Sequence, residues 1–149
     1  MKLDSITLNL KKNVFQYLIG FGFYLLIHGS FQPIKLILGF SAFIITYSAI
    51  YPYNDLMDYE EDKKDEFKKH YKALARGDMS QKDAITLVFG LTVIGLFIAS
   101  FVSEWYMTLL IILLLQNFLH SSPQTTDTFK GNTTYMIINM FIMQFLKFT

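Results

Sequence analysis

Apolar blocks about as long as a membrane-spanning helix recur along this chain, and they limit the folds that it can adopt. A helix crosses the hydrocarbon core of a bilayer with about 20 mostly apolar residues. One long charged loop, over residues 54–82, separates the second block from the third. We therefore expect an all-α, polytopic transmembrane helix bundle of about five spans, at residues 14–31, 34–53, 84–102, 105–119 and 135–148.

The composition agrees with a membrane location and excludes several kinds of site. Of 149 residues, 52% are hydrophobic and 17% aromatic, which is more apolar than an ordinary soluble domain. The chain has no cysteine, so it has no disulfide, thiol nucleophile or cysteine-ligated metal. Its lysines are mixed with acids, unlike a stripe that binds a duplex, so no nucleic-acid partner is expected. Five spans leave no room for a second domain, and residues 1–149 are predicted to form a single transmembrane domain.

Small residues occur within two of the predicted spans. Gly20 and Gly22 in the first block would allow another helix to approach closely. The third block has small residues at Gly90, Gly95 and Ala99.

The basic residues predict which side of the membrane each loop faces. If the N-terminus is inside and five spans alternate, the seven Lys and Arg residues of the 54–82 loop lie inside. Lys2, Lys11, Lys12 and Lys130 lie on the same side, which leaves only Lys35 and Lys147 outside. Because basic residues gather on the cytosolic side, we expect an integral, multi-pass membrane protein whose charged loop is cytosolic.

The start of this loop is strongly acidic. Seven of the twelve carboxylates fall within residues 55–66, directly after an apolar block. On a helix, Asp55, Asp58 and Asp62 would lie at i, i+3 and i+7 and would form one stripe. Like charges at these spacings repel, and a divalent cation, or a cation carrying a phosphate, would neutralise them. Mg²⁺ prefers such hard oxygen ligands, in part from substrate phosphates.

The same residues have a second interpretation. Acids and lysines at helical spacing often form a solvated face, here with pairs such as Glu60 with Lys64 and Asp65 with Lys69. The apolar block directly before the acids argues against this face, because uncompensated charge is costly next to buried residues. A Mg²⁺–diphosphate group would instead use the carboxylates for its metal and the lysines and Arg76 for its phosphate oxygens. Neighbouring spans would then supply an apolar cleft for a lipid tail.

Three stretches resemble the UbiA superfamily of intramembrane prenyltransferases. Asn54-Asp55-x-x-Asp58-x-x-x-Asp62 has the form of the first Asp-rich motif of that family. Residues 72–80, Lys-Ala-Leu-Ala-Arg-Gly-Asp-Met-Ser, resemble its Arg-Pro-Leu-Pro-Ser-Gly-x-Ile-Ser segment, without the prolines. A weaker resemblance to a later motif of the family occurs at residues 120–123, His-Ser-Ser-Pro, and 129–131, Phe-Lys-Gly. The order of helices and motifs is similar to the first half of the family's all-helical fold.

The resemblance implies a Mg²⁺-dependent enzyme that transfers an isoprenoid group from a prenyl diphosphate to an acceptor, or acts on a polyprenyl phosphate. Asp55, Asp58 and Asp62 would bind Mg²⁺, and the first two are the candidate catalytic residues. Asn54 would bind the metal ion or orient the groups that bind it. The phosphate would contact Lys72, Arg76 and Lys130, of which Lys72 is the better candidate, since Arg76 stands where the family has a small residue. The acceptor and the isoprenoid length are left open.

One departure from the family pattern suggests an incomplete enzyme. The family places a second Asp-rich motif after its sixth span, and after Asp83 only Glu104 and Asp127 remain here. We therefore expect a truncated chain, one part of a split enzyme, a protein that needs a second subunit, or a degenerate relative. The alternative function is a non-catalytic membrane binding or scaffold protein, with the loop as a charged face.

Overall fold

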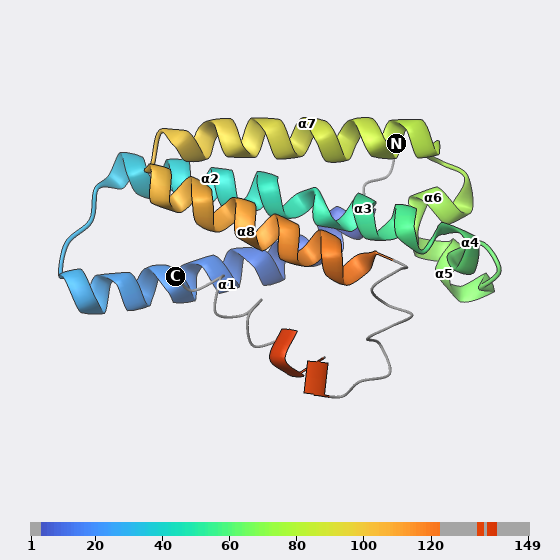
Figure 1. The fold of residues 1–149 in the computed structure, drawn as a ribbon, viewed down its shortest axis with the longest axis horizontal. Coiled ribbons are helices and arrows are strands. Elements are labelled where there is room, and N and C mark those ends of the chain that lie inside the picture. Colours follow the sequence, from blue (N-terminus) through green and yellow to red (C-terminus); the bar gives the residue numbers. More distant parts are fainter. Residues whose placement is uncertain (1–3, 123–133, 136, 140–149) are drawn as a thin grey trace.

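The computed structural model describes residues 4–122, 134, 135 and 137–139, and within them it contains helices and no strand. The predicted all-α class is therefore confirmed for this part of the chain. Four long helical segments run along the long axis, and three short helices gather at one end (Figure 1). The elements are α1 Asp4–His28, α2 Pro33–Ser48, α3 Ile50–Met57, α4 Tyr59–Asp62, α5 Glu66–Tyr71, α6 Ala73–Arg76, α7 Gln81–Ser100 and α8 Glu104–Ser121.

Proline interrupts the second long helical segment. Pro52 has no N–H, and its ring crowds the carbonyl four residues earlier, which belongs to Ser48. α2 ends at Ser48 and α3 begins at Ile50. The amide of Ala49 between them donates to the carbonyl of Thr46 at 3.1 Å, in a tighter i→i+3 turn. The helical course then resumes, so the segment continues beyond the predicted end at residue 53.

The predicted 54–82 loop is largely helical. Residues 54–57 finish α3, and α4, α5 and α6 follow before α7 begins at Gln81. Because α3 carries the chain past the apolar block, Asn54 and Asp55 sit on the same helix as the buried Ile50. At the other end of the chain, α1 begins at Asp4, so the polar lead-in is also helical. α1 ends at His28, because Gly29 follows in the left-handed conformation (φ 68°).

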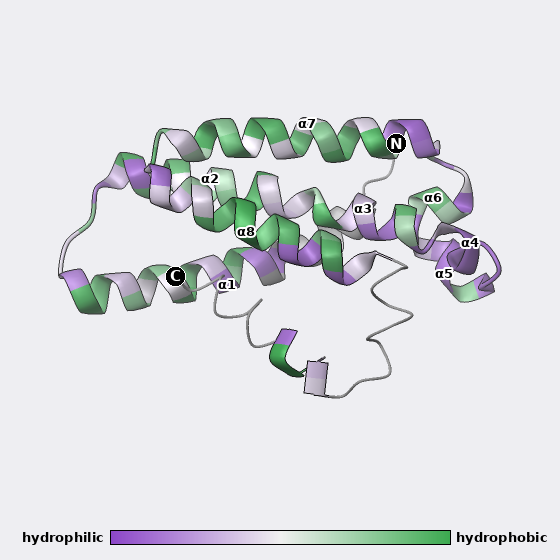
Figure 2. Cartoon of the chain, viewed as in Figure 1, coloured by the Kyte–Doolittle hydropathy of each residue, from purple (hydrophilic) through white to green (hydrophobic). Residues whose placement is uncertain are grey.

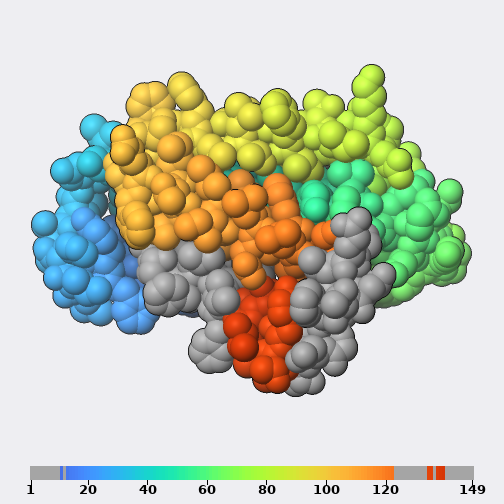
Figure 3. Space-filling model, in the orientation of Figure 1, coloured from blue at the N-terminus to red at the C-terminus, as the bar shows by residue number. Residues whose placement is uncertain are grey.

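The main core lies between the α2–α3 segment and the helices α7 and α8. Phe43, Tyr47 and Leu113 are among its buried side chains. In the space-filling view, α7 and α8 lie side by side over α2, of which only a narrow strip is visible (Figure 3). This packing fixes the direction of α3, and therefore where its C-terminal residues point.

α7 approaches α2 most closely at a glycine. A Cβ atom on Gly95 would lie 2.0 Å from the hydroxyl oxygen and 2.8 Å from the amide nitrogen of Thr46. Only a residue without a side chain allows this approach. Gly22, by contrast, has no described atom within 4 Å of such a Cβ. The close approach in this structure therefore involves the third block, at one of the small residues that the sequence has there.

Two tyrosines join the outer helices to the backbone of α2. The hydroxyl of Tyr17, in α1, donates to the carbonyl of Leu36 at 3.1 Å. The hydroxyl of Tyr106, in α8, donates to the carbonyl of Gly39 at 2.7 Å. A hydroxyl in apolar surroundings is costly without a partner, so these bonds hold α1 and α8 against the N-terminal half of α2.

The long helices are rich in apolar residues (Figure 2), and many of their large apolar side chains are exposed. On α7, Phe89 is 70% exposed and Phe97 is 65% exposed. Two stretches, Pro33–Met57 and Gln81–Ser100, are long and apolar enough to cross a membrane. The apolar part of α1 is shorter, at Asn13–His28. The five-span arrangement and the cytosolic side of the charged end stay predictions, and most of the fifth segment, 135–148, lies outside the described residues.

The contact between α2 and α7 gives a test of this packing. We expect Gly95→Val to lower the free energy of unfolding by about 1–3 kcal/mol, because the added side chain overlaps Thr46. The matched control is Gly90→Val on the same helix, where a Cβ meets no described atom within 4 Å. Thermal unfolding of the detergent-solubilised protein, followed by circular dichroism, measures both. Equal melting temperatures for the two variants would contradict the packing.

Candidate functional site

The acidic and basic residues of the 54–82 segment fold against the end of α3, at the polar end of the bundle (Figure 2). α3 ends at Met57, and Asp58 (φ −91°, ψ 5°) separates it from α4. Asp65 begins α5 by accepting hydrogen bonds from the amides of Phe67 at 2.9 Å and Lys68 at 3.2 Å. Such an N-cap satisfies amides that have no partner within the helix.

The second half of this segment is shaped by a glycine and a serine. Gly77 ends α6 in the left-handed conformation (φ 85°), which glycine adopts without strain. Ser80 and Asp83 form a capping box that begins α7. These caps give a structural reason for the glycine and the serine of the 72–80 stretch. They turn the chain so that Lys72, between α5 and α6, lies beside the end of α3.

Lys72 lies among the three aspartates of the predicted stripe. Its Nζ is 2.5 Å from Oδ2 of Asp62, 3.3 Å from Oδ1 of Asp55 and 3.8 Å from Oδ2 of Asp58. Lys68 Nζ is 2.7 Å from the other oxygen of Asp62. The structure therefore brings the three aspartates around a single cation, and that cation is the ammonium group of a lysine.

Two of these three carboxylates are buried rather than part of a solvated face. Asp62 is 1% exposed and Asp55 is 7% exposed, while the side chain of Asp58 is 38% exposed. A buried carboxylate is costly unless it is paired and hydrogen-bonded, and Lys72 and Lys68 supply the pairing for Asp62. Burial alone would lower the pKa of Lys72, but its hydrogen bond to Asp62 and the charges of Asp55 and Asp62 raise the pKa above the usual lysine value. The ammonium group is therefore charged at neutral pH.

The pairing corrects one expectation and changes another. The sequence suggested that a divalent cation would neutralise the stripe, and in the structure lysines of the chain lie against its carboxylates. The expected pair of Asp65 with Lys69 is replaced by Glu66 with Lys69 at 2.6 Å, because Asp65 caps α5. Sequence spacing does not reveal the three contacts of Lys72 with the aspartates, since all of them depend on the turns around α5 and α6.

The side-chain oxygens of the residues at the end of α3 are of the kind that bind a hard metal ion, although they are not arranged as a metal site in this structure. Within the described residues, no group of three or more Asp, Glu, His or Cys side chains is arranged to hold a metal ion. Asn54, however, has a buried side-chain oxygen without a hydrogen-bond partner in the described structure. A buried acceptor of this kind is costly unless a donor or a cation reaches it. With Asp55 and Asp58, it forms a set of oxygen atoms of the chemistry that Mg²⁺ prefers.

The other two predicted phosphate ligands are Arg76, which the structure describes, and Lys130, which it does not. Arg76 donates to Oδ2 of Asp78 at 2.7 Å and to the carbonyl of His70 at 2.6 Å. These bonds hold the turn between α5 and α7. Lys130 lies outside the described residues. Of the predicted basic ligands, Lys72 is therefore the one that the structure places among the aspartates.

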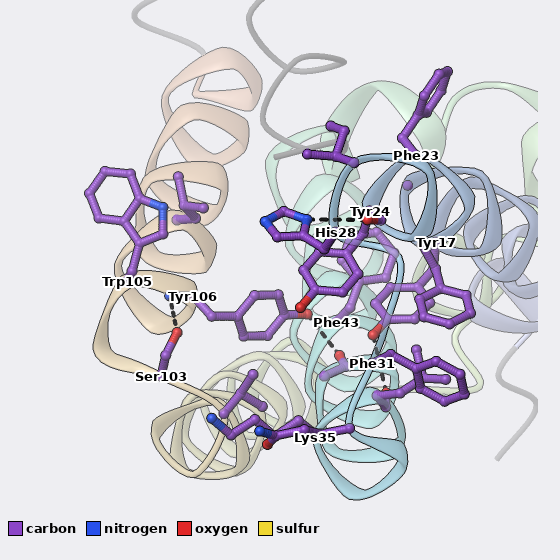
Figure 4. Close-up of a pocket in the computed structure, with 18 of the residues that line it drawn as sticks. Tyr17, Phe23, Tyr24, His28, Phe31, Lys35, Phe43, Ser103, Trp105 and Tyr106 are labelled. Carbon is purple, nitrogen blue, oxygen red and sulfur yellow. Dashed lines mark hydrogen bonds between the residues drawn. The ribbon is translucent and has the colours of Figure 1, made fainter.

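A cavity of about 710 Å³ lies at the opposite end of the bundle. Its walls come from the end of α1 and the beginnings of α2 and α8, and they are rich in aromatic rings such as Tyr17, Phe43 and Tyr106 (Figure 4). Phe43 is the lining residue of the α2–α3 segment nearest to Asp55, which it precedes by twelve residues, roughly 18 Å along a helix. A small ligand in this cavity therefore does not contact the carboxylates.

Comparison with known proteins gives one match. A family model described as the UbiA prenyltransferase family matches residues 14–141, which is most of the chain. The matched range includes the acidic stretch and residues 72–80. Searches among curated proteins and among solved structures found no match.

The buried pairing of Asp62 gives a second test. We expect Asp62→Ala to lower the free energy of unfolding by about 1–3 kcal/mol, because Lys68 and Lys72 lose the hydrogen-bonded partner that they share. Glu66→Ala removes the exposed pair with Lys69, which water and salt screen, and should lower the melting temperature much less than Asp62→Ala does. Thermal unfolding compares the two variants. Equal losses would show that Asp62 is no more important to the fold than a surface acid.

Proposed function

The chain belongs to the UbiA prenyltransferase family, and from this premise we propose that its acidic end binds Mg²⁺ and the diphosphate of a prenyl donor. One observation carries the proposal. At the polar end of a bundle with an apolar surface, three aspartates and a lysine share a partly buried cluster. The donor is an amphiphile, with an anionic head for the cluster and a hydrocarbon chain for the apolar helices or the surrounding lipid.

The residues divide into two groups by charge. Asp55 and Asp58, with the free oxygen of Asn54, would hold the metal. When bound, Mg²⁺ would offset the negative charge that develops on a departing diphosphate. Lys72 and Lys68 would donate hydrogen bonds to phosphate oxygens. Asp62, which the sequence suggested as a third metal ligand, holds these two lysines with its two oxygens in this structure.

The remaining parts of the proposal follow the family and the charge distribution. The substrate is a prenyl diphosphate or a polyprenyl phosphate, and the acceptor is left open. The protein would be a multi-pass integral membrane protein with the acidic end at the cytosolic face, because eleven of its thirteen Lys and Arg residues would lie on that side. Arg76 and Lys130 remain proposed phosphate ligands.

We propose binding of the donor rather than catalytic turnover, because the family's second Asp-rich motif is not found in this sequence. A second subunit or further chain would supply those carboxylates for turnover. The competing proposal, a scaffold whose acids merely face water, is less consistent with an Asp62 that is 1% exposed. A binding measurement separates the two proposals without requiring catalysis.

We expect the double variant Asp55→Asn and Asp58→Asn to weaken Mg²⁺-dependent binding of geranyl diphosphate by at least about tenfold. The amides keep the size of the side chains and remove the charges that attract the metal. Binding of the labelled donor to purified protein in detergent measures the loss.

Glu61→Gln is the matched control, since it removes a charge from an exposed acid of the same segment. It should leave the affinity within about twofold of wild type, because an exposed charge is screened. Unchanged donor affinity in the double aspartate variant would exclude the proposed site.

Removal of the metal gives a further expected result. EDTA should abolish binding of the donor but should not lower the melting temperature, because Lys72 and Lys68 already neutralise the buried Asp62. A large fall in melting temperature with EDTA would instead indicate that a metal holds the fold together.

A further inference from the structure

The position of Lys72 suggests how the proposed site changes when it is filled. We propose that Lys72 is a positioning residue that takes the place of the divalent cation in the metal-free protein and moves to the diphosphate when metal and diphosphate bind together. The inference rests on the proposed function and names the way in which that site is regulated.

The first reason is competition for the same oxygens. The ammonium group of Lys72 lies 3.3 Å from Oδ1 of Asp55 and 3.8 Å from Oδ2 of Asp58. A metal ion held by these two carboxylates would lie next to that ammonium group, and the two cations would repel. Mg²⁺ alone must therefore displace Lys72, whereas Mg²⁺ with a diphosphate brings negative charge that attracts it.

The second reason is that Asp62 keeps a partner when the side chain of Lys72 moves. Asp62 accepts from Lys72 at 2.5 Å and from Lys68 at 2.7 Å, and it is buried. Lys68 continues to pair with Asp62, and the incoming metal ion replaces Lys72 at the buried Asp55, so the ammonium group of Lys72 can turn away without leaving either carboxylate unpaired. A lysine suits this movement because its charge is carried on a flexible four-carbon stem.

The third reason is that the backbone at Lys72 is held in place. Its amide donates to the carbonyl of Lys68 at 3.0 Å, and its carbonyl accepts from the amide of Arg76 at 3.0 Å. Only the side chain needs to move. The same backbone position therefore presents the charge either to the aspartates or to a phosphate beside them.

Coupling follows from this exchange. Metal alone should bind weakly, diphosphate alone should bind weakly, and each should strengthen the other by the same factor. Such coupling would keep the site from being filled by free Mg²⁺, so the metal would be bound mainly when the anionic head of the donor is present.

The test measures Mn²⁺ binding, with and without inorganic diphosphate, from the electron paramagnetic resonance signal of free Mn²⁺, after subtraction of the signal lost to the soluble Mn²⁺–diphosphate complex in a protein-free titration. We expect Lys72→Gln to bind Mn²⁺ alone at least about tenfold more tightly than wild type, because the competing charge is gone. The same variant should lose most of the enhancement by diphosphate. Lys72→Arg keeps a cation and should resemble wild type without diphosphate.

Lys69→Gln is the matched control, because it removes a lysine charge from the same segment but pairs with the exposed Glu66. Its Mn²⁺ affinity should stay within about threefold of wild type. A Lys72→Gln protein that binds Mn²⁺ alone no more tightly than wild type overturns the inference and leaves the proposed function intact. A wild-type protein whose Mn²⁺ binding is not strengthened by diphosphate overturns both.

A second pair of variants covers the case in which Lys72→Gln does not fold. Asp62→Asn with Lys72→Gln removes the buried charge and its partner together, which avoids an unpaired carboxylate. This double variant should bind Mn²⁺ more tightly than Asp62→Asn alone. A general loss of structure would weaken metal binding, so a gain in affinity is a result that damage to the fold does not produce. Equal affinities in this pair again overturn the inference.

Discussion

The buried contact of Lys72 with the aspartates is the interaction on which the polar end of this molecule depends. Asp62 is almost completely buried, and a carboxylate in such surroundings must be paired. The pairing requires a lysine from the segment after α4 to return to the end of α3. The short helices α5 and α6, with their caps, make this return possible. The fold of the charged segment and the chemistry of the proposed site therefore have the same cause.

The apolar part of the molecule positions this end. Pro52 interrupts the second helical segment, and α3 then carries Asn54 and Asp55 beyond the apolar core. The approach of α7 at Gly95 holds α2 in place, while α7 and α8 present apolar side chains outward. An apolar exterior with charge concentrated at one end is consistent with membership of the UbiA prenyltransferase family. Under the proposed function, the anionic group of a prenyl donor would bind at that end.

Much of the fold could be predicted from the sequence, and the errors have physical reasons. Long apolar blocks predicted the long helices, because their length and polarity are local properties. The 54–82 segment was expected to be a loop, yet it forms three short helices; Asp65 caps α5, Gly77 ends α6, and the Ser80–Asp83 box begins α7. Caps of this kind act over a few residues and give no periodic pattern. At Gly22, where the sequence would allow a helix to approach, no described atom lies within 4 Å of an added Cβ: a glycine permits a contact, but the neighbouring helix decides where the contact occurs.

The sequence by itself determined that helices form, that their surfaces are apolar, and that the acids of one stretch could share a face, since these features follow from composition and spacing along the chain. It also supplied the motif that the family match now supports. Only the tertiary structure decided which cation those acids meet. Lys72 lies ten residues after Asp62 and seventeen after Asp55. A contact over that separation depends on how the intervening turns are closed and packed, which no local pattern specifies.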